Sequence, residues 1–166
     1  MAYDQDTAFA ACVLAAEWTS SSALHTHVAH KEGVAAYVPG RFYERELPCI
    51  DAVLSEVRAP LGVVVVDGYV WLDDRGRRGL GAHLFDALGG RVPVVGVAKT
   101  AFRGAAFALQ VLRGGSTRPL HVTAIGMDPA AAAERVAAMH GPHRIPTLLR
   151  EVDRLCRAGV GVSCLP

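Results

Sequence analysis

The sequence has no long hydrophobic run, no marked excess of charge and no closely spaced pair of cysteines. No apolar stretch in its 166 residues approaches the roughly 20 residues that a membrane-spanning helix needs. Met1 leads directly into the polar turn Asp4-Gln5-Asp6, which argues against a hydrophobic signal peptide. We therefore expect a cytoplasmic protein with no membrane partner.

The low net charge also limits the partners that the whole surface can attract. The formal net charge is +1, so basic residues would have to gather locally to bind nucleic acid. One such group, Arg75, Arg77 and Arg78, lies in a Gly-rich turn. It either contacts a nucleic-acid backbone or forms a solvated charged turn.

Cysteine usage argues against both a zinc site and a disulfide framework. Cys12, Cys49, Cys156 and Cys164 include no CxxC pair, and reduced, mostly buried thiols are typical of a cytosolic protein. The chain shows no internal repeat, low-complexity tract or linker. Hydrophobic residues make up 51% of it, enough for a full core, so we predict a single domain over residues 1–166.

Two β-capable segments near the N-terminus predict an antiparallel hairpin. Residues 8–18 and 24–29 are apolar or alternating, and the residues between them have turn chemistry. His25 and His27 share one face of the second strand, and His30 follows, with no acid or cysteine beside the first two. A solvated strand face is therefore favoured over a metal site.

The most apolar segment is Leu61 to Gly68, in which four consecutive valines precede Asp67. Such a run predicts a central strand buried on both sides of a sheet. Asp67 then lies at the carboxyl end of the strand, where ligands collect in open α/β sheets. The alternative is that Asp67 caps the turn that follows.

The remaining patterns predict a mixed α/β domain. Apolar spacing indicates helices over residues 42–57, 79–88, 130–139 and 147–157. Further strands are predicted over residues 92–97, 106–112 and 120–125. Glu46 falls in the first turns of its helix, and Asp128-Pro129 begins another. Lys99 and Thr100 follow the carboxyl end of the strand over 92–97.

Five short motifs occur in one order along the chain. They are Tyr37-Val-Pro-Gly, Arg45-Glu46-x-Pro48, Val66-Asp67-Gly68, Gly79-Leu-Gly-Ala-His83 and Gly96-Val-Ala-Lys99-Thr100. Each motif alone is weak, but five in register are specific, and Arg144-Ile-Pro with Arg150 extends the match. Over most of its length the sequence resembles endonuclease V, an inosine-directed nuclease.

The resemblance implies a ribonuclease H-like fold, an α/β architecture with a mixed β-sheet of about five strands flanked by helices. It also implies a metal-dependent endonuclease that cleaves a phosphodiester near deoxyinosine or inosine, in DNA repair or RNA processing. The expected partner is therefore inosine-containing DNA or RNA, and the oligomeric state stays open.

The resemblance assigns the catalytic chemistry to Glu46, Asp67 and Lys99. Glu46 and Asp67 match two metal-binding carboxylates, whose oxygens suit Mg²⁺ or Mn²⁺. Such an ion would activate water and screen the charge of the phosphate. Lys99 matches a lysine near the catalytic centre and would contact the scissile phosphate.

Other residues are assigned to lesion recognition by the same resemblance. Tyr37 and Pro39 would belong to a stiff wedge loop that inserts beside the lesion. Gly79 and Gly81 would line the pocket that receives the flipped base through backbone contacts. His83 lies in the same motif, where it either serves the pocket or packs as a hydrogen-bonded helix histidine.

The N-terminus departs from the family pattern, which begins its first strand with Asp-x-(Ser/Ala)-aromatic. With Tyr3 as the aromatic residue, the metal-binding Asp would fall one position before Met1. Asp4 or Asp6 would replace it only if the strand slipped in register, which turns side chains to the opposite face.

A second departure follows the valine run, where the family has Asp-Gly-x-Gly-x-x-His. Here Val70 stands at the second glycine and Asp73 at the histidine. Asp73, like Asp4, is a further candidate metal ligand, but a carboxylate cannot act as a neutral or cationic imidazole near a phosphate. Gly126-Met127-Asp128 likewise stands where the family often has Gly-His.

Three hypotheses follow from the sequence. The chain is an active endonuclease V-like enzyme, a catalytically impaired homologue that binds nucleic acid through its wedge and pocket, or a plain α/β domain with another partner. Salt-sensitive binding to nucleic acid would separate the second hypothesis from the third, because phosphate contacts release counterions.

Overall fold

The computed structural model describes residues 1–4, 7–33 and 41–162. They fall into two compact units, which we name the terminal unit (residues 1–59 and 146–166) and the middle unit (residues 60–145). Tyr37, Pro39 and Asp6 lie outside the described residues, so the predictions for them stay predictions. The prediction of a single domain is likewise untested.

The terminal unit contains a three-stranded antiparallel sheet. Its strands are β1 (Ala2–Asp4), β2 (Thr7–Leu14) and β3 (His25–Lys31), in the order β1-β2-β3. β2 and β3 pair with Cys12 opposite His27, which confirms the predicted hairpin. His25 is exposed, but His27 and Ala29 on the same face are half-buried, and Ala29 packs against the core cluster. The prediction of a solvated face for His25 and His27 is therefore confirmed only for His25, and the more exposed face of β3 is the opposite one.

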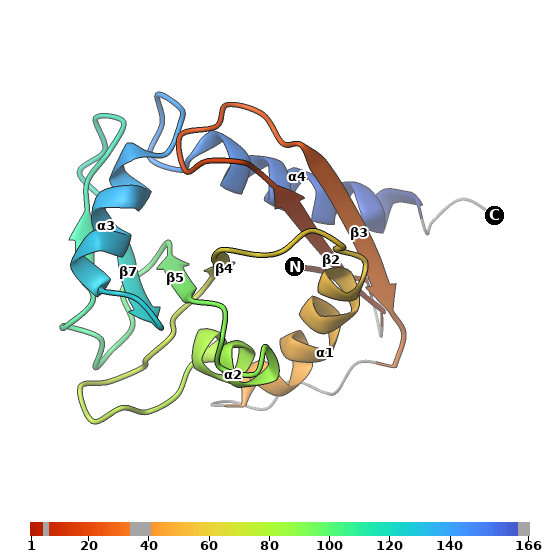
Figure 1. Cartoon of the computed structure of the whole chain (residues 1–166), viewed down its shortest axis with the longest axis horizontal. Helices are drawn as coiled ribbons and strands as arrows, with labels where there is room; N and C mark the ends of the chain where they lie inside the picture. The colour runs from red at the N-terminus through yellow and green to blue at the C-terminus, as the bar shows by residue number, and fades with distance from the viewer. Residues whose placement is uncertain (5–6, 34–40, 163–166) are drawn as a thin grey trace. The chain divides into compact units, whose positions relative to one another are not determined.

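Helices α1 (Phe42–Ser55) and α4 (Thr147–Val162) both pack against β2 (Figure 1). Ala8 and Ala10 cluster with Cys49 and Val53 of α1. Phe9 points to the other face, because side chains alternate along a strand, and lies close to Gly159 of α4. The terminal unit is therefore three layers, with the sheet between two helices.

The middle unit contains a four-stranded mixed sheet. Its strands are β4 (Val64–Asp67), β5 (Val94–Ala98), β7 (Leu120–Ile125) and β6 (Leu109–Val111), in that spatial order. β4 and β5 are parallel, and the other pairs are antiparallel. The mixed sheet of an α/β fold is therefore confirmed, with the strands divided between two sheets.

Two helices pack on the sheet of the middle unit. α2 (Leu80–Ala87) contacts β5 and β7, and α3 (Pro129–Ala138) contacts β6 and β7. The carboxylate of Asp128 accepts the backbone N–H of Ala131 at 2.9 Å and caps α3, as its sequence predicts. Among the described residues, no helix combines the length and apolar character needed to cross a membrane.

The valine run corrects one expectation. β4 is not the central strand of its sheet but the first in the strand order, and only Val66 is fully buried. β5, in which every residue is buried, lies inside the sheet instead. An apolar run shows that a strand packs against a core, but it does not show how many strands flank it.

Gly96 lets the chain that follows β4 pack directly on β5. A Cβ atom there would lie 2.6 Å from the carbonyl oxygen of Gly68 and 2.9 Å from both Thr123 Oγ1 and the Val70 nitrogen. Thr123 Oγ1 also accepts the Val70 N–H at 2.8 Å. The segment after Asp67 is thus held against the centre of the sheet.

Replacing Gly96 by alanine is therefore expected to lower the free energy of unfolding by about 1–3 kcal/mol, the usual cost of overpacking a core. Urea unfolding measures the loss. The control is Gly62→Ala, because no atom lies within 4 Å of the Cβ position at Gly62. Equal stability of the two variants would contradict the close packing described here.

Candidate functional site

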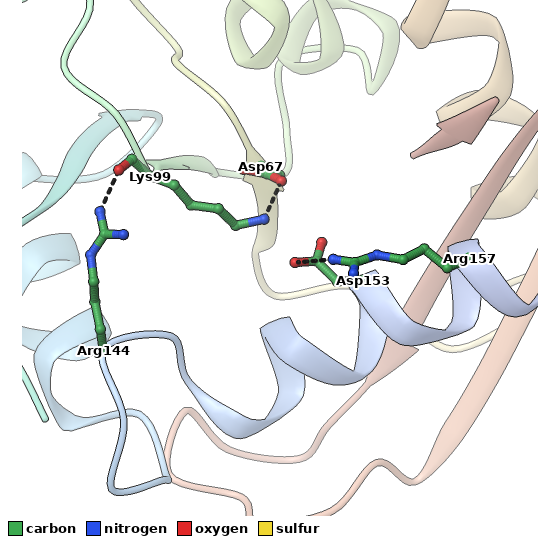
Figure 2. Close-up of polar contacts among 5 residues, drawn as sticks. All are labelled: Asp67, Lys99, Arg144, Asp153 and Arg157. Carbon is green, nitrogen blue, oxygen red and sulfur yellow. Dashed lines mark hydrogen bonds and ion pairs between the residues drawn. The ribbon is translucent and has the colours of Figure 1, made fainter.

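Asp67 and Lys99 meet at the carboxyl ends of two parallel strands. Asp67 is the last residue of β4 and lies opposite Val97 of β5, and Lys99 follows β5 directly. Lys99 Nζ lies 2.7 Å from Asp67 Oδ2 (Figure 2). The structure thus brings together two residues that are 32 positions apart in the sequence, at the strand ends where a ligand was predicted.

This ion pair is open to solvent. The side chain of Asp67 is 54% exposed and that of Lys99 is 35% exposed. An exposed pair of this kind contributes at most about 1 kcal/mol to stability, so its carboxylate and ammonium can exchange partners at little cost. The pair offers one cation for an anionic ligand and one carboxylate that can accept a proton or a hydrogen bond.

Arg144 holds the backbone on which Lys99 stands. Its Nη2 donates to the carbonyl oxygen of Lys99 (Figure 2) and to that of Pro119 at 2.8 Å. Its Nε donates to the carbonyl oxygen of Arg118 at 2.9 Å. One guanidinium therefore fixes the chain leaving β5 to the chain entering β7.

Arg113 holds the loop that carries Arg144. Its guanidinium donates to the carbonyl oxygens of Met139, Gly141 at 3.2 Å, His143 at 3.1 Å and Arg144 at 3.5 Å. Burial lowers the pKa of Arg113. Four carbonyl groups are thus satisfied by one side chain.

Tyr69 holds the segment that follows Lys99. Its hydroxyl donates to the carbonyl oxygen of Thr100 at 2.8 Å and accepts the N–H of Phe102 at 3.1 Å. The residue is 8% exposed, and burial raises the pKa of its phenol. Backbone on both sides of Thr100 is thereby tied to the chain after β4.

Glu46 belongs to the terminal unit, where it lies in α1 and is 6% exposed. The hydroxyl of Tyr3 donates to its Oε1 at 3.3 Å. The guanidinium of Arg45 stacks over the Tyr3 ring, 3.9 Å from its centre. Burial, followed by the charge of Glu46, raises the pKa of Tyr3. Glu46 is thus part of a buried polar cluster.

The glycines predicted to line a base pocket pack tightly at the start of α2. A Cβ at Gly79 would lie 2.4 Å from the carbonyl oxygen of Tyr69, and one at Gly81 would lie 2.7 Å from Cγ2 of Val70. Val70 itself is completely buried. Close packing therefore requires both glycines. Their role in base binding, like that of the half-buried His83, stays a prediction.

Asp73 stabilises the arginine-rich turn. Its Oδ1 accepts the backbone N–H groups of Arg75 at 3.0 Å and Arg77 at 2.9 Å. Arg78 pairs with Asp86 at 2.5 Å, while Arg75 and Arg77 are exposed. The carboxylate at position 73 therefore holds the turn that presents these two arginines.

Within the ranges that the structure describes, no three His, Cys, Asp or Glu residues lie together as metal ligands. Glu46 is bonded to Tyr3, and Asp67 is paired with Lys99. Asp4 lies in β1. The assignment of Glu46, Asp67, Asp4 and Asp73 as metal ligands stays a prediction.

Sequence patterns do not reveal the roles of Arg113 and Tyr69. Both side chains bond to backbone groups, which every residue carries, so no partner residue marks them in the sequence. Arg144 had one signal, its place in the Arg144-Ile-Pro motif.

Comparison with known proteins identifies relatives of the chain. The family model of endonuclease V matches residues 1–138. The endonuclease V of Streptomyces coelicolor is 35% identical over 146 residues, which cover 75% of this chain and 60% of that protein. The chain therefore spans about 60% of the length of this curated relative.

Solved structures show the same fold. The endonuclease V structure from Streptomyces avermitilis matches with a TM-score of 0.70 and 24% identity, over 96% of this chain and 82% of that one. The Ciona intestinalis endonuclease V, solved with a 24mer DNA containing an inosine, matches with a TM-score of 0.72 and 15% identity. That match covers 95% of this chain and 85% of the other.

Arg113→Met is expected to lower the free energy of unfolding by about 2–4 kcal/mol, because it leaves several carbonyl groups without their donor. Urea unfolding is the measurement. Arg75→Met removes the same charge from an exposed side chain and is expected to change stability by about 0.5 kcal/mol or less. A loss of similar size in both variants would show that Arg113 does not act through its carbonyl partners.

The buried phenol of Tyr69 predicts a pH dependence. Because its folded-state pKa is raised above the unfolded value of about 10, stability is retained below pH 10 and falls as the pH rises through the folded pKa. Tyr69→Phe removes this contribution, up to about 1.4 kcal/mol per pH unit. Unfolding free energies of both proteins between pH 8 and about pH 11 test it. Parallel curves would rule out titration of Tyr69.

Proposed function

Because this chain belongs to the endonuclease V family, we propose that it is an endonuclease acting on nucleic acid that contains inosine. The observation that carries the proposal is the pairing of Asp67 with Lys99 at adjacent strand ends. Support for the substrate comes from the Ciona intestinalis relative, whose structure contains DNA with an inosine.

The reaction is hydrolysis of a phosphodiester, in which water adds to phosphorus and a sugar oxygen leaves. The ammonium of Lys99 contacts the phosphate oxygens on which negative charge develops. Before substrate binds, Asp67 serves as its counter-ion. A phosphate then takes over this role, and Asp67 becomes free to accept a hydrogen bond or a proton.

Recognition of the lesion involves other elements. We assign the wedge to Tyr37 and Pro39, and the pocket for the flipped base to Gly79, Gly81 and His83. Their support is the match of their motifs to the family. The substrate is DNA or RNA, in repair or in RNA processing.

Mg²⁺ or Mn²⁺ is the cofactor that the resemblance implies. Its proposed ligands are Glu46 and Asp67, whose carboxylate oxygens suit these ions. Glu46 belongs to the terminal unit and Asp67 to the middle unit, and cleavage assays with and without Mg²⁺ or Mn²⁺ test whether either ion is needed.

A second candidate function is binding of nucleic acid without cleavage. Three carboxylates with a proposed metal or catalytic role have other partners: Glu46 bonds to Tyr3, Asp67 pairs with Lys99 and Asp73 holds a turn. A protein with these contacts could keep a wedge and pocket and yet fail to hydrolyse the strand.

The test is cleavage of inosine-containing single strands and duplexes, beside adenosine controls, without metal and with Mg²⁺ or Mn²⁺. We expect nicking only where inosine is present. Lys99→Met or Asp67→Asn should slow it by about 10²–10³-fold, the usual effect of removing one group that stabilises the transition state. Asp51→Asn, an exposed change on α1, should leave the rate unchanged.

Binding measured on the same strands decides between the two candidates. Binding to inosine strands without nicking would favour the second candidate. Absence of both binding and nicking would contradict both. Full activity of Lys99→Met and Asp67→Asn would remove these residues from the site.

A further inference from the structure

Helix α4 presents three arginines on one face. Arg150, Arg154 and Arg157 are spaced by four and three residues, and this spacing puts side chains on one side of an α-helix. All three are exposed. We name this group the arginine stripe.

The opposite face of α4 is packed in the terminal unit. Leu148 is 5% exposed and Cys156 is 1% exposed. A Cβ at Gly159 would lie 2.7 Å from Cδ1 of Phe9. At 100° per residue these positions lie about half a turn from the arginine stripe. The apolar side of the helix therefore packs against the sheet, and the arginine stripe faces solvent.

The stripe is only partly neutralised. Arg157 lies 4.0 Å from Asp153 (Figure 2) and is 78% exposed. Within the described part of the chain, Arg150 and Arg154 have no ion-pair partner. Glu151 and Asp153 flank the stripe and are half-buried. The positive charges thus project beyond the acids of the same helix.

The geometry favours a nucleic-acid strand over a lipid surface. With a rise of 1.5 Å per residue, the stripe extends about 10.5 Å, which is about three successive phosphate-to-phosphate steps along the axis of one strand of duplex DNA. A helix that binds a membrane inserts its apolar face, whereas the apolar face of α4 is packed against β2. A row of guanidinium groups suits phosphates, which it can bind through paired hydrogen bonds.

We propose that the arginine stripe of α4 binds the phosphate backbone of a nucleic-acid strand, independently of the base sequence. The proposal rests on the proposed function for its partner, and it adds a contact surface in the terminal unit. It supplies affinity rather than inosine recognition, because phosphate contacts carry no base information.

The experiment measures binding of the full chain to two labelled oligonucleotides, one with and one without inosine, over a range of salt concentrations. The variant is Arg150→Gln, Arg154→Gln and Arg157→Gln combined, which keeps good helix formers on an exposed face. Circular dichroism checks that it folds. The single variant Arg154→Gln is also measured. Its matched control is Arg58→Gln, which removes one exposed arginine elsewhere in the terminal unit.

We expect the triple variant to bind both oligonucleotides more weakly by the same factor. Its plot of log affinity against log salt should be less steep by about 2–3, since each phosphate contact contributes roughly 0.7–0.9 to the slope. Arg154→Gln should lower the slope by about 1, and Arg58→Gln should leave it unchanged.

The outcomes separate the stripe from the proposed function. If the parent binds and the triple variant keeps its slope, the stripe is not a backbone contact, although the proposed function stands. If the parent binds neither oligonucleotide, the proposed function fails and the stripe loses its partner. A loss confined to the inosine strand would also overturn the proposal.

Discussion

The candidate site depends on the parallel pairing of β4 with β5. Its register sets Asp67 opposite Val97, so that the residue ending one strand lies beside the residue that follows the other. A shift of one residue would turn Asp67 to the opposite face of the sheet and separate it from Lys99. The register is in turn protected by the absence of a side chain at Gly96, where the chain after β4 crosses the sheet at close range.

Around this pair, the backbone is held by side chains that bind carbonyl groups. Arg113 fixes residues 139–144, Arg144 fixes the chain on which Lys99 stands, and Tyr69 fixes the residues after it. Most of these bonds are partly buried, where leaving an acceptor without its donor is costly. The ion pair itself is exposed and weak. Backbone held by these hydrogen bonds therefore carries an exposed ion pair, an arrangement that suits a binding or catalytic site.

The sequence predicted the helices and strands more accurately than it predicted which elements and residues they contact. The strand over 120–125 was predicted to the residue, and every predicted helix is present within a few residues of its expected ends. The edge position of β4 was missed, because valines favour a strand whether it has one partner or two. The contacts of Arg113 were also missed. These contacts depend on where the loop over residues 139–144 folds, and no residue type in that loop predicts that its carbonyl groups will accept hydrogen bonds from Arg113.

The departures from the family pattern have local structural explanations. At the position of the expected glycine, Val70 is fully buried against Gly81 and donates its N–H to Thr123. At the position of the expected histidine, Asp73 accepts hydrogen bonds from the backbone N–H groups of Arg75 and Arg77 in its own turn. A residue engaged in packing or in turn bonds is not free to contact a phosphate. Asp67 and Lys99 differ because their exposed contact is with each other, and a phosphate can take the place of Asp67 beside Lys99. The proposed mechanism therefore begins with that exchange.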